Sequence, residues 1–441
     1  MASQFSLFRH RRFTPMFFTQ FLGAFNDNFF KQALILLLTY TGAAALGMDI
    51  ALLNNLAAML FILPFFLFSA LAGQLADKYD KSRLTNYIKI LEIIIMVLAG
   101  VGLIFELYWL LFVALFLLGT QSTFFGPIKY AYLPQAMHDD ELVGANGLFQ
   151  TGTSLSILLG MMVAGIVATL NGYVYWVAGL TLVFAILGYV AARLVPATPA
   201  PQPNLTVDWN IFRTSWQTIQ YLRTLPLLFF IIMGNSWFWF YGATFLTQTP
   251  EFSKVILHGD ETVVIFLLTL FSVGVAIGSL LCKTLTRNQV SFKVLPFGIA
   301  GLSLFAIGLF WALSRLDFTV DEGALLGVMD VVSMPSAWWV FICLFLLGFS
   351  GGIYIVPLYA AMQAYSPVSH RARVIGANNI FNAIFMVGSA IFSIVILSVI
   401  GLTLPQLFLI TGIINLAFGI FLYRKLKAKE QQTDLTPSDT L

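Results

Sequence analysis

Charge is what this chain has least of. Of its 441 residues, 10% are charged and 59% are hydrophobic, whereas soluble domains carry about 25% charged residues. This composition excludes a water-soluble fold and predicts a membrane protein. Cysteine is also rare: only Cys282 and Cys343 occur, both in or beside apolar runs. No disulfide framework is therefore expected.

Groups suited to catalysis or metal binding are scarce as well. The chain has only four histidines, none of them within a predicted span, at His10, His138, His258 and His370. The sequence contains no recognisable nucleophile–base pair or metal-ligand cluster, so an enzyme is the least expected class. We expect no cofactor other than a coupling ion, either Na⁺ or H⁺, and no nucleic acid partner.

Long apolar runs fill most of the chain. Runs of about twenty residues predict about twelve transmembrane helices. Their approximate centres are Phe25, Ile62, Met96, Leu118, Leu158, Phe184, Trp237, Phe271, Leu304, Leu346, Met386 and Ile413. Basic residues outside the spans concentrate on one side of the membrane, and the opposite loops contain only Lys254 and Arg315. By the positive-inside rule, both termini are predicted to be cytoplasmic.

The chain reads as two six-helix halves joined by a linker. Four prolines open the stretch 196–224, which then turns polar and basic, as in a cytoplasmic linker that ends in a surface helix. The segments Val143–Gln150 and Ile375–Asn382 resemble each other, and each opens the fifth helix of its half. The predicted parts are 1–195 (first half), 196–224 (linker), 225–424 (second half) and 425–441 (polar cytoplasmic tail). Duplicated halves of six helices are typical of major facilitator transporters, an all-α membrane fold.

The loop after the second span supports that fold. Residues 73–83 read Gly-Gln-Leu-Ala-Asp-Lys-Tyr-Asp-Lys-Ser-Arg, which resembles the signature loop of the major facilitator superfamily. Asp77 would end a helix, where it can meet amide donors or a basic residue of a neighbouring helix and latch one conformation. We predict a cytoplasmic gate at Gly73, Asp77, Lys78 and Arg83. The alternative is a simple positive-inside turn.

Five ionisable residues lie within spans, and all belong to the first half: Asp27, Lys31, Lys89, Glu92 and Lys129. Charges at membrane depth are costly and usually functional. Asp27 and Lys31 are four residues apart, so they could form an ion pair within the helix. Alternatively, Asp27 binds a cation, a proton or an ammonium group. Lys89 and Lys129 could reach the cytoplasmic interface or bind a phosphate in a cavity.

Uncharged polar residues add further candidates. Asn146 and Gln150 share one stripe of the fifth span, and Asn378 and Asn382 lie in the eleventh. These amides could bind substrate or join helices to each other. Asn235 and Trp237 lie in the seventh span, where they could belong to an aromatic belt or line an apolar cavity. A charged first half facing an apolar second half favours an amphiphilic substrate.

Four stretches of the first half resemble the lysophospholipid transporter family of the major facilitator superfamily. They are residues 20–28 (Gln-Phe-Leu-Gly-Ala-Phe-Asn-Asp-Asn), 73–77 (Gly-Gln-Leu-Ala-Asp), 126–130 (Gly-Pro-Ile-Lys-Tyr) and 142–148 (Leu-Val-Gly-Ala-Asn-Gly-Leu). Asp27, Lys129 and Asn146 fall in these stretches, whereas Lys89 and Glu92 depend on their placement alone. Lys31 departs from the family, where an apolar residue is expected.

The resemblance implies a flippase of the bacterial inner membrane. It would move lysophosphatidylethanolamine and related lysolipids from the outer to the inner leaflet, where an acyltransferase–acyl carrier protein synthetase restores the missing acyl chain. Because this chain ends in a polar tail, we expect that enzyme to be a separate partner. We also expect contact with membrane lipids and a monomeric transporter.

Two alternatives remain open at this point. The first is an exporter of a siderophore, drug or polar metabolite on the same fold. The fifth span lacks the Gly-Pro pair typical of antiporters, which lowers the expectation of a proton-coupled drug exporter. The second is a membrane anchor that transports nothing and recruits a soluble acyltransferase through its basic cytoplasmic face.

Overall fold

Helices make up most of the described part of the chain. The structure is a computed structural model that describes residues 4–48, 50–316 and 325–434. Within these ranges no strand forms, and one isolated bridge joins Gly259 and Leu326. The prediction of an all-α fold is therefore confirmed. Of the predicted polar tail, residues 435–441 lie outside the described part.

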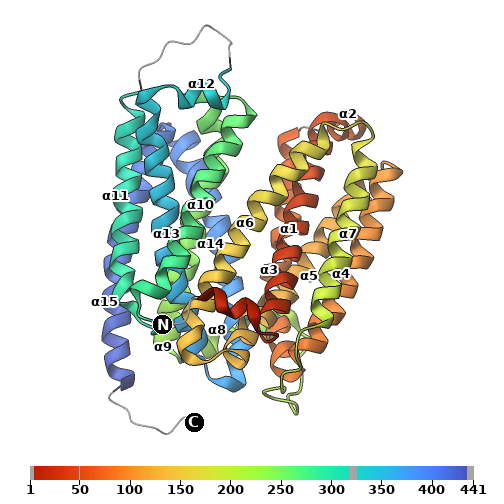
Figure 1. The fold of residues 1–441 in the computed structure, drawn as a ribbon, viewed down its shortest axis with the longest axis vertical. Helices are drawn as coiled ribbons and strands as arrows, with labels where there is room; N and C mark the ends of the chain where they lie inside the picture. Colours follow the sequence, from red (N-terminus) through yellow and green to blue (C-terminus); the bar gives the residue numbers. More distant parts are fainter. Residues whose placement is uncertain (1–3, 49, 317–324, 435–441) are drawn as a thin grey trace. The chain divides into compact units, whose positions relative to one another are not determined.

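Figure 1 shows the helices and their labels. The α-helices are α1 (Thr14–Leu37), α2 (Ala43–Leu46), α3 (Ile50–Lys78), α4 (Lys81–Ile104), α5 (Tyr108–Ala136), α6 (Leu142–Ala168), α7 (Tyr173–Arg193), α8 (Ile211–Arg223), α9 (Pro226–Glu251), α10 (Glu261–Leu285), α11 (Leu295–Leu313), α12 (Val328–Val332), α13 (Trp338–Tyr365), α14 (Arg371–Ile394) and α15 (Leu404–Asp434). Short π-helical turns extend α1, α9 and α14 at their ends.

Eleven described helices are long and apolar enough to cross a membrane. They are α3 to α7, α9 to α11 and α13 to α15. Helix α1 has 24 residues, which is also long enough at about 1.5 Å per residue. Its polar residues Asn26, Asp27, Asn28 and Lys31 lower its hydropathy below that of the other eleven. With α1 included, each predicted span centre falls within one of these helices.

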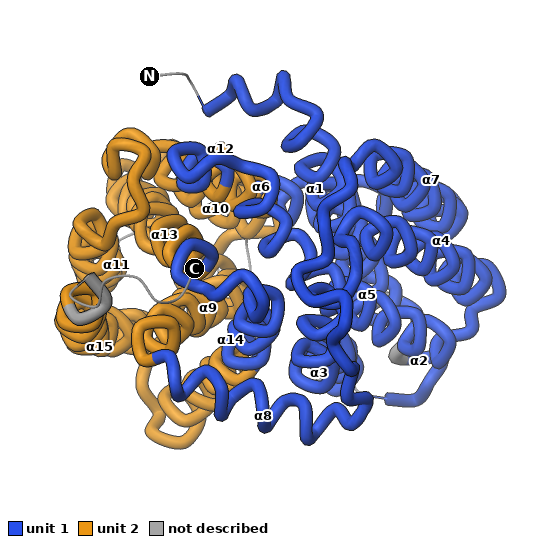
Figure 2. Tube along the Cα trace, turned by 90° about the horizontal axis from the view of Figure 1, so that it is seen from below, with its two compact units in different colours: residues 1–145, 155–225, 363–383 blue, residues 146–154, 226–362, 384–441 orange. Residues whose placement is uncertain are grey.

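The chain divides into two compact units, coloured separately in Figure 2. Unit 1 consists of Met1–Ala145, Leu155–Leu225 and Gln363–Ala383, and unit 2 of Asn146–Ser154, Pro226–Met362 and Ile384–Leu441. Helices α6 and α14 therefore contribute residues to both units.

Unit 1 is built around packed apolar helices. Helix α4 packs against α5 and α7, α3 packs against α5, and α1 packs against α7. These helices run side by side in Figure 1. Their shared core includes the fully buried Phe29, Phe30 and Leu115. The rings of Phe25 and Phe184 lie 4.4 Å apart and join α1 to α7. This packing brings the polar residues of α1 against α4 and α5.

Unit 2 contains a close approach between two helices. A side chain at Gly278 would collide with the backbone carbonyl of Phe349, and one at Gly348 would collide with that of Phe271. Helices α10 and α13 can therefore pack backbone against backbone only because both positions are glycine. The same unit packs α15 against α9 and α11.

At the start of α10, hydrogen bonds from Thr262 and Val263 to Asp260 hold the pKa of that carboxyl below its usual value.

The repeated segments begin their helices alike. A short 3-10 turn, η3 (Asp139–Glu141), precedes α6, and another, η7 (Val368–His370), precedes α14. Val143–Gln150 lies in the first turns of α6, and Ile375–Asn382 lies near the start of α14. The local structure thus repeats along with the sequence.

The predicted surface helix of the linker is α8. The non-helical segment before α8 is bound to the end of α3 by hydrogen bonds. The amide of Gln202 donates to the carbonyl oxygen of Asp77 (2.9 Å), and the amide of Asp208 donates to Oε1 of Gln74 (3.0 Å). Helix α8 then packs against α3. The linker is therefore anchored next to the signature loop.

Candidate functional site

A buried ion pair lies at the centre of unit 1. Nζ of Lys89 is 2.5 Å from Oε2 of Glu92, one turn further along α4, and neither side chain is exposed. The amide of Asn26 on α1 donates to Oε1 of Glu92 (3.0 Å), and the amide of Gln121 on α5 donates to Oε2 (3.1 Å). A buried pair needs such additional hydrogen bonds to offset the loss of water. The snorkelling proposed as an alternative for Lys89 is therefore wrong.

Small residues make room for this pair. A Cβ atom at Gly23 would lie 2.5 Å from Nζ of Lys89, and one at Gly188 would lie 3.6 Å from it. The ammonium group also lies 5.2 Å from the ring centroid of Phe125, within the range of a cation–π contact. Helices α1, α5 and α7 thus enclose Lys89 on different sides.

Asp27 faces a different helix from its neighbour Asn26. Its Oδ2 accepts a hydrogen bond of 2.5 Å from the hydroxyl of Ser122 on α5. Its Oδ1 is buried and has no hydrogen-bond partner within the described ranges. A buried carboxylate oxygen without a donor carries a desolvation penalty. A ligand, a proton or a cation that binds this atom would remove that penalty.

The ion pair between Asp27 and Lys31 does not form. The described residues contain four ion pairs within 4.0 Å, and none joins these two side chains. Lys31 instead donates to Oδ1 of Asn28 (3.2 Å) and lies 5.1 Å from the ring centroid of Phe61 on α3. Spacing of four residues allowed the pair, but partners on neighbouring helices hold the two side chains apart.

One hydroxyl connects Asp27 to the buried pair. Oγ of Ser122 lies 2.5 Å from Asp27 and 3.1 Å from Oε1 of Gln121, and the amide nitrogen of Gln121 donates to Glu92. Because a serine hydroxyl carries one hydrogen, it can donate to only one of these two oxygens at a time. Ser122 therefore lies between the Asp27 carboxylate and the Gln121 amide that binds Glu92, and its hydroxyl donates to one of them at a time.

Lys129 forms no ion pair with a carboxylate of the described residues. No described acidic group lies within 4.0 Å of its Nζ. The ammonium group lies 5.0 Å from the ring centroid of Tyr130 and 5.9 Å from that of Phe125, and it interacts electrostatically with Asp27 and Lys89. The cluster thus holds more lysines than carboxylates, which suits an anionic group such as a phosphate.

The contact predicted for Asp77 is present. Its Oδ1 accepts from the amide of Ala372 (3.0 Å), and its Oδ2 accepts from Nε of Arg373 (3.0 Å). Arg373 also donates to Oε1 of Gln202 in the linker (2.7 Å). A Cβ atom at Gly73 would clash with the backbone of Arg373, so the small residue permits the approach of α3 and α14. This latch consists of Asp77, Arg373 and the Ala372 amide.

The other predicted gate residues do not enter the latch. Lys78 follows Asp77, and its ammonium group lies 5.5 Å from the ring centroid of Tyr79. The backbone amide of Arg83 donates to Oδ1 of Asp80 (2.9 Å), which caps α4. Neither basic side chain forms an ion pair with Asp77 in the structure.

The predicted amides fall in both units. Asn378 and Asn382 lie on the part of α14 that belongs to unit 1, and Asn146 and Gln150 lie on the part of α6 that belongs to unit 2. All four are buried. Asn379, beside Asn378, packs against Gly126 on α5, one turn before Lys129. Within unit 1, this places the start of α14 close to the helix that carries Lys129.

Trp237 and Asn235 belong to the interior of unit 2. Nε1 of Trp237 donates to Oδ1 of Asn415 on α15 (2.8 Å). Its ring stacks on Phe240, and the ring of Phe418 lies tilted against it with the centroids 4.6 Å apart. Trp237 is 6% exposed, which does not fit an interfacial belt. Asn235 is fully buried, and its amide lies 3.7 Å from the sulfur of Met362.

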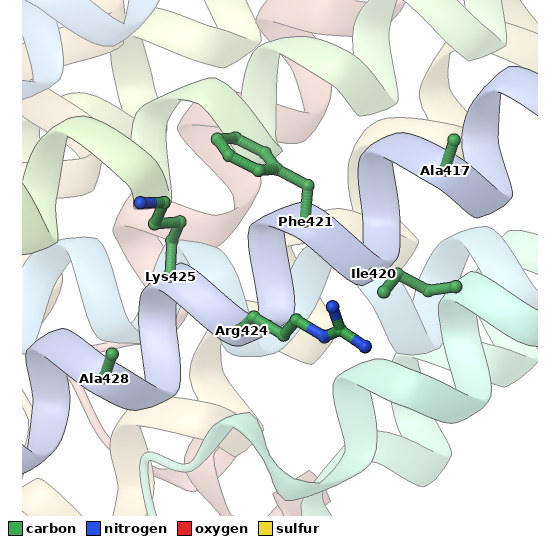
Figure 3. A pocket seen from close by; sticks show the side chains of 6 residues that line it. All are labelled: Ala417, Ile420, Phe421, Arg424, Lys425 and Ala428. Atoms are coloured by element: carbon green, nitrogen blue, oxygen red, sulfur yellow. The ribbon is translucent and has the colours of Figure 1, made fainter.

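A surface depression lies elsewhere, on unit 2. Figure 3 shows its lining on α15, which comprises Ala417, Ile420, Phe421, Arg424, Lys425 and Ala428. Its volume is about 480 Å³. All six residues come from one helix, and no polar groups from other helices converge there. We therefore take the cluster around Asp27 as the candidate site.

Sequence reasoning missed several members of the site. Gln121, Ser122 and Arg373 were not predicted, although a Gln-Ser pair within an apolar run was a visible signal. The partners of Glu92 depend on how α1 and α5 are rotated, which no spacing along α4 reveals. Among the described residues, no group of three His, Cys, Asp or Glu side chains could hold a metal ion.

Long apolar helices together with a charged cluster inside a bundle define a multi-pass membrane transporter. The sequence model of the Major Facilitator Superfamily matches residues 16–321. The chain therefore belongs to the major facilitator superfamily. Its predicted class, a transporter and not an enzyme, is confirmed by this membership.

Individual relatives agree with this assignment. The chain is 28% identical to the lysophospholipid transporter LplT of Cronobacter sakazakii over 372 residues, which cover 82% of this chain and 81% of the relative. It is 29% identical to the LplT of Klebsiella pneumoniae over 356 residues, 78% of each chain. The predicted resemblance to that family is confirmed.

A solved structure supports the fold alone. The human organic anion transporter MFSD10 (TETRAN) superposes with a TM-score of 0.69 over 94% of this chain and 99% of its own, at 14% identity. The major facilitator fold predicted from the duplicated halves is thereby confirmed.

Proposed function

We propose that the chain moves a lysophospholipid across the bacterial inner membrane by alternating access. The transport would run from the outer to the inner leaflet, and lysophosphatidylethanolamine is the proposed substrate. The relatives named lysophospholipid transporter LplT support the substrate class. The concentration of charge on the helices of unit 1 supports an amphiphile with a charged head group.

One observation carries the proposal. Among the described residues, no donor reaches the buried Oδ1 of Asp27, and no carboxylate lies within 4.0 Å of the Lys129 ammonium group. A phosphoethanolamine head group carries both complements, an ammonium group for Asp27 and a phosphate for Lys129. Charge-assisted hydrogen bonds of this kind are the stronger ones in proteins.

The remaining candidates take supporting roles in this proposal. Lys31 and Lys89 set the charge around Asp27, with Lys89 acting through Glu92. Amides on the repeated helices would contact the glycerol backbone, and the seventh span would shelter the acyl chain. The amides are Asn146, Gln150, Asn378 and Asn382. The residues of the seventh span are Asn235 and Trp237.

The ion that drives transport, the termini and the partners are also proposals. Asp27 could bind either Na⁺ or H⁺, because its free oxygen suits both. We propose a monomer whose two termini are cytoplasmic. A separate acyltransferase–acyl carrier protein synthetase would consume the lysolipid delivered to the inner leaflet.

Purified protein in vesicles provides the test. Inward movement of fluorescent lysophosphatidylethanolamine would be compared for the native chain, Asp27→Asn and Lys129→Gln. We expect each substitution to slow transport about tenfold or more, because a hydrogen bond to a charged group contributes about 1.5–3 kcal/mol. Lys425→Gln, at an exposed lysine of α15, is the matched control and should transport normally.

Two results would contradict the proposal in different ways. Unchanged transport in both Asp27→Asn and Lys129→Gln would refute the site but not the substrate. Failure of the native chain to move lysolipid, or failure of unlabelled lysolipid to compete, would refute the substrate class and favour an exporter of polar compounds.

A further inference from the structure

Helix α8 turns its apolar side outward. Trp209, just before the helix, and Phe212 are each 70% exposed, and Trp216 is 59% exposed. The face against the protein instead carries the buried Thr214 and Thr218, with Leu222 as its one fully buried apolar side chain. A surface helix in water normally does the reverse. The three aromatic residues, which we name the aromatic stripe, lack a protein surface to cover them within unit 1.

The chain holds this helix at the end of the spans. Helix α8 ends at Arg223 and the span α9 begins at Pro226, so the connection can reach at most about 11 Å. On the other side, the amide of Asp208 donates to Gln74 in the last turns of the span α3. Figure 2 shows α8 running across the view, whereas α4, α5 and α7 of the same unit are seen end-on. The helix therefore lies crosswise to the spans of unit 1, next to the end of α3.

The charges of α8 complement an anionic surface. Within the helix, Arg213 and Arg223 are the only ionisable side chains apart from Tyr221, and both arginines are exposed. At about 3.6 residues per turn, Arg223 lies on the side of the aromatic stripe. Arg213 falls beside the exposed Gln217, on the adjoining polar side. The exposed surface thus passes from aromatic through basic to polar, as in helices that lie in a membrane surface.

We propose that α8 is a lipid-binding helix embedded in the surface of the adjacent leaflet, which is the predicted cytoplasmic leaflet. The aromatic stripe occupies the region between head groups and acyl chains, where Trp residues are favoured. Arg213 and Arg223 bind anionic head groups, and Gln217 faces water. This inference does not depend on which compound the chain transports.

Site-specific fluorescence tests the proposal in the full chain. Cysteine replaces Phe212 or Gln217 in a Cys282→Ala/Cys343→Ala background, and each is labelled with an environment-sensitive dye. The protein is reconstituted in vesicles of phosphatidylcholine, alone or mixed equally with phosphatidylglycerol. We expect a spin-labelled lipid to quench the dye at 212 about threefold or more strongly than the dye at 217, and aqueous iodide to show the opposite order.

The electrostatic part has its own comparison. Phosphatidylglycerol should increase lipid quenching at 212, and Arg213→Gln/Arg223→Gln should abolish that increase. Should iodide reach the dye at 212 as readily as that at 217 in both vesicles, α8 is not embedded. Protection at 212 that appears only on adding soluble cell protein would show that a protein covers the stripe, and would also overturn the proposal. If the cysteine-free background does not fold, trypsin cleavage of the native chain at Arg213 and Arg223 replaces the dye. The cleavage is compared between vesicles without and with phosphatidylglycerol.

Discussion

At the scale of single residues, Lys89 and Glu92 behave as one neutral unit. Both side chains are fully buried, and Asn26 and Gln121 occupy the remaining carboxylate positions. Pairing alone rarely repays the removal of two charges from water. The hydrogen bonds from α1 and α5 therefore decide whether α4 can carry these charges inside the bundle.

Removing one partner of this ion pair should destabilise the protein more than replacing both partners. Glu92→Gln leaves the Lys89 ammonium group without its carboxylate, and we expect a loss of about 3–5 kcal/mol in the free energy of unfolding. Lys89→Gln/Glu92→Gln, which leaves no charge, should lose less. Thermal unfolding of the native chain, Lys89→Gln, Glu92→Gln and the double variant in detergent measures the coupling as a double-mutant cycle. A loss in the double variant equal to the sum of the two single losses would show that the pair is not coupled.

Contacts between helices override the i,i+4 pairing of Asp27 with Lys31 that the sequence spacing allows. Four residues separate Asp27 from Lys31, but Ser122 from another helix takes the carboxylate and Asn28 takes the lysine. An i,i+4 ion pair contributes only about 0.2–0.5 kcal/mol in isolated helices. A hydrogen bond to a charged group contributes more, so the contact across helices prevails.

At the scale of elements, glycine decides how closely helices approach. On α10, Gly278 lies against the carbonyl of Phe349 on α13, where no side chain can move aside to accept a methyl group. The contact therefore depends on backbone atoms alone.

Gly278→Ala should consequently destabilise unit 2. We expect a loss of about 1–3 kcal/mol, the usual cost of forcing extra atoms into a packed contact. Gly242→Ala on α9 is the matched control, because a Cβ atom there would meet nothing within 4 Å. It should be neutral or slightly stabilising, since alanine favours helix. Thermal unfolding compares the two, and equal behaviour would rule out the packing argument.

At the scale of the whole molecule, the signature loop connects distant parts of the sequence. Asp77 on α3 binds Arg373 and the Ala372 amide at the start of α14, and Gln202 of the linker joins them. Residues almost 300 positions apart therefore meet in one hydrogen-bond network. Such a contact can stabilise one state of a transport cycle and open in another.

Asp77→Asn should shift the chain toward the state in which this latch is open. The substitution weakens a charge-assisted contact of about 1.5–3 kcal/mol, which corresponds to a change of roughly tenfold or more in the equilibrium. A cysteine at Ser69, buried where α3 meets Gly376, reports the change. We expect faster labelling by a water-soluble maleimide in Asp77→Asn.

Lys78→Gln serves as the control for the latch. Its side chain forms no ion pair with Asp77 in the structure, so the labelling rate at position 69 should not change. An unaltered rate in Asp77→Asn as well would mean that the latch does not govern access to this face.

Much of the architecture could be predicted without coordinates. Apolar runs predicted all eleven described helices that are apolar enough to cross a membrane, and the predicted centre at Phe25 falls in α1. The copies near Asn146 and Asn378 indicated the duplication. The signature loop predicts amide and basic donors for Asp77, and Ala372 and Arg373 provide them. These predictions succeeded because hydropathy and helix ends are local properties of the chain.

The sequence by itself determined that this protein is a helical membrane transporter whose span charges all lie in its first half. Only the tertiary structure decided that Lys89 is buried against Glu92, that Asp27 meets Ser122 instead of Lys31, and that the aromatic stripe of α8 faces outward. The physical reason is that a side chain's partner depends on the rotation and neighbours of its helix. Spacing along one helix restricts those neighbours without selecting them.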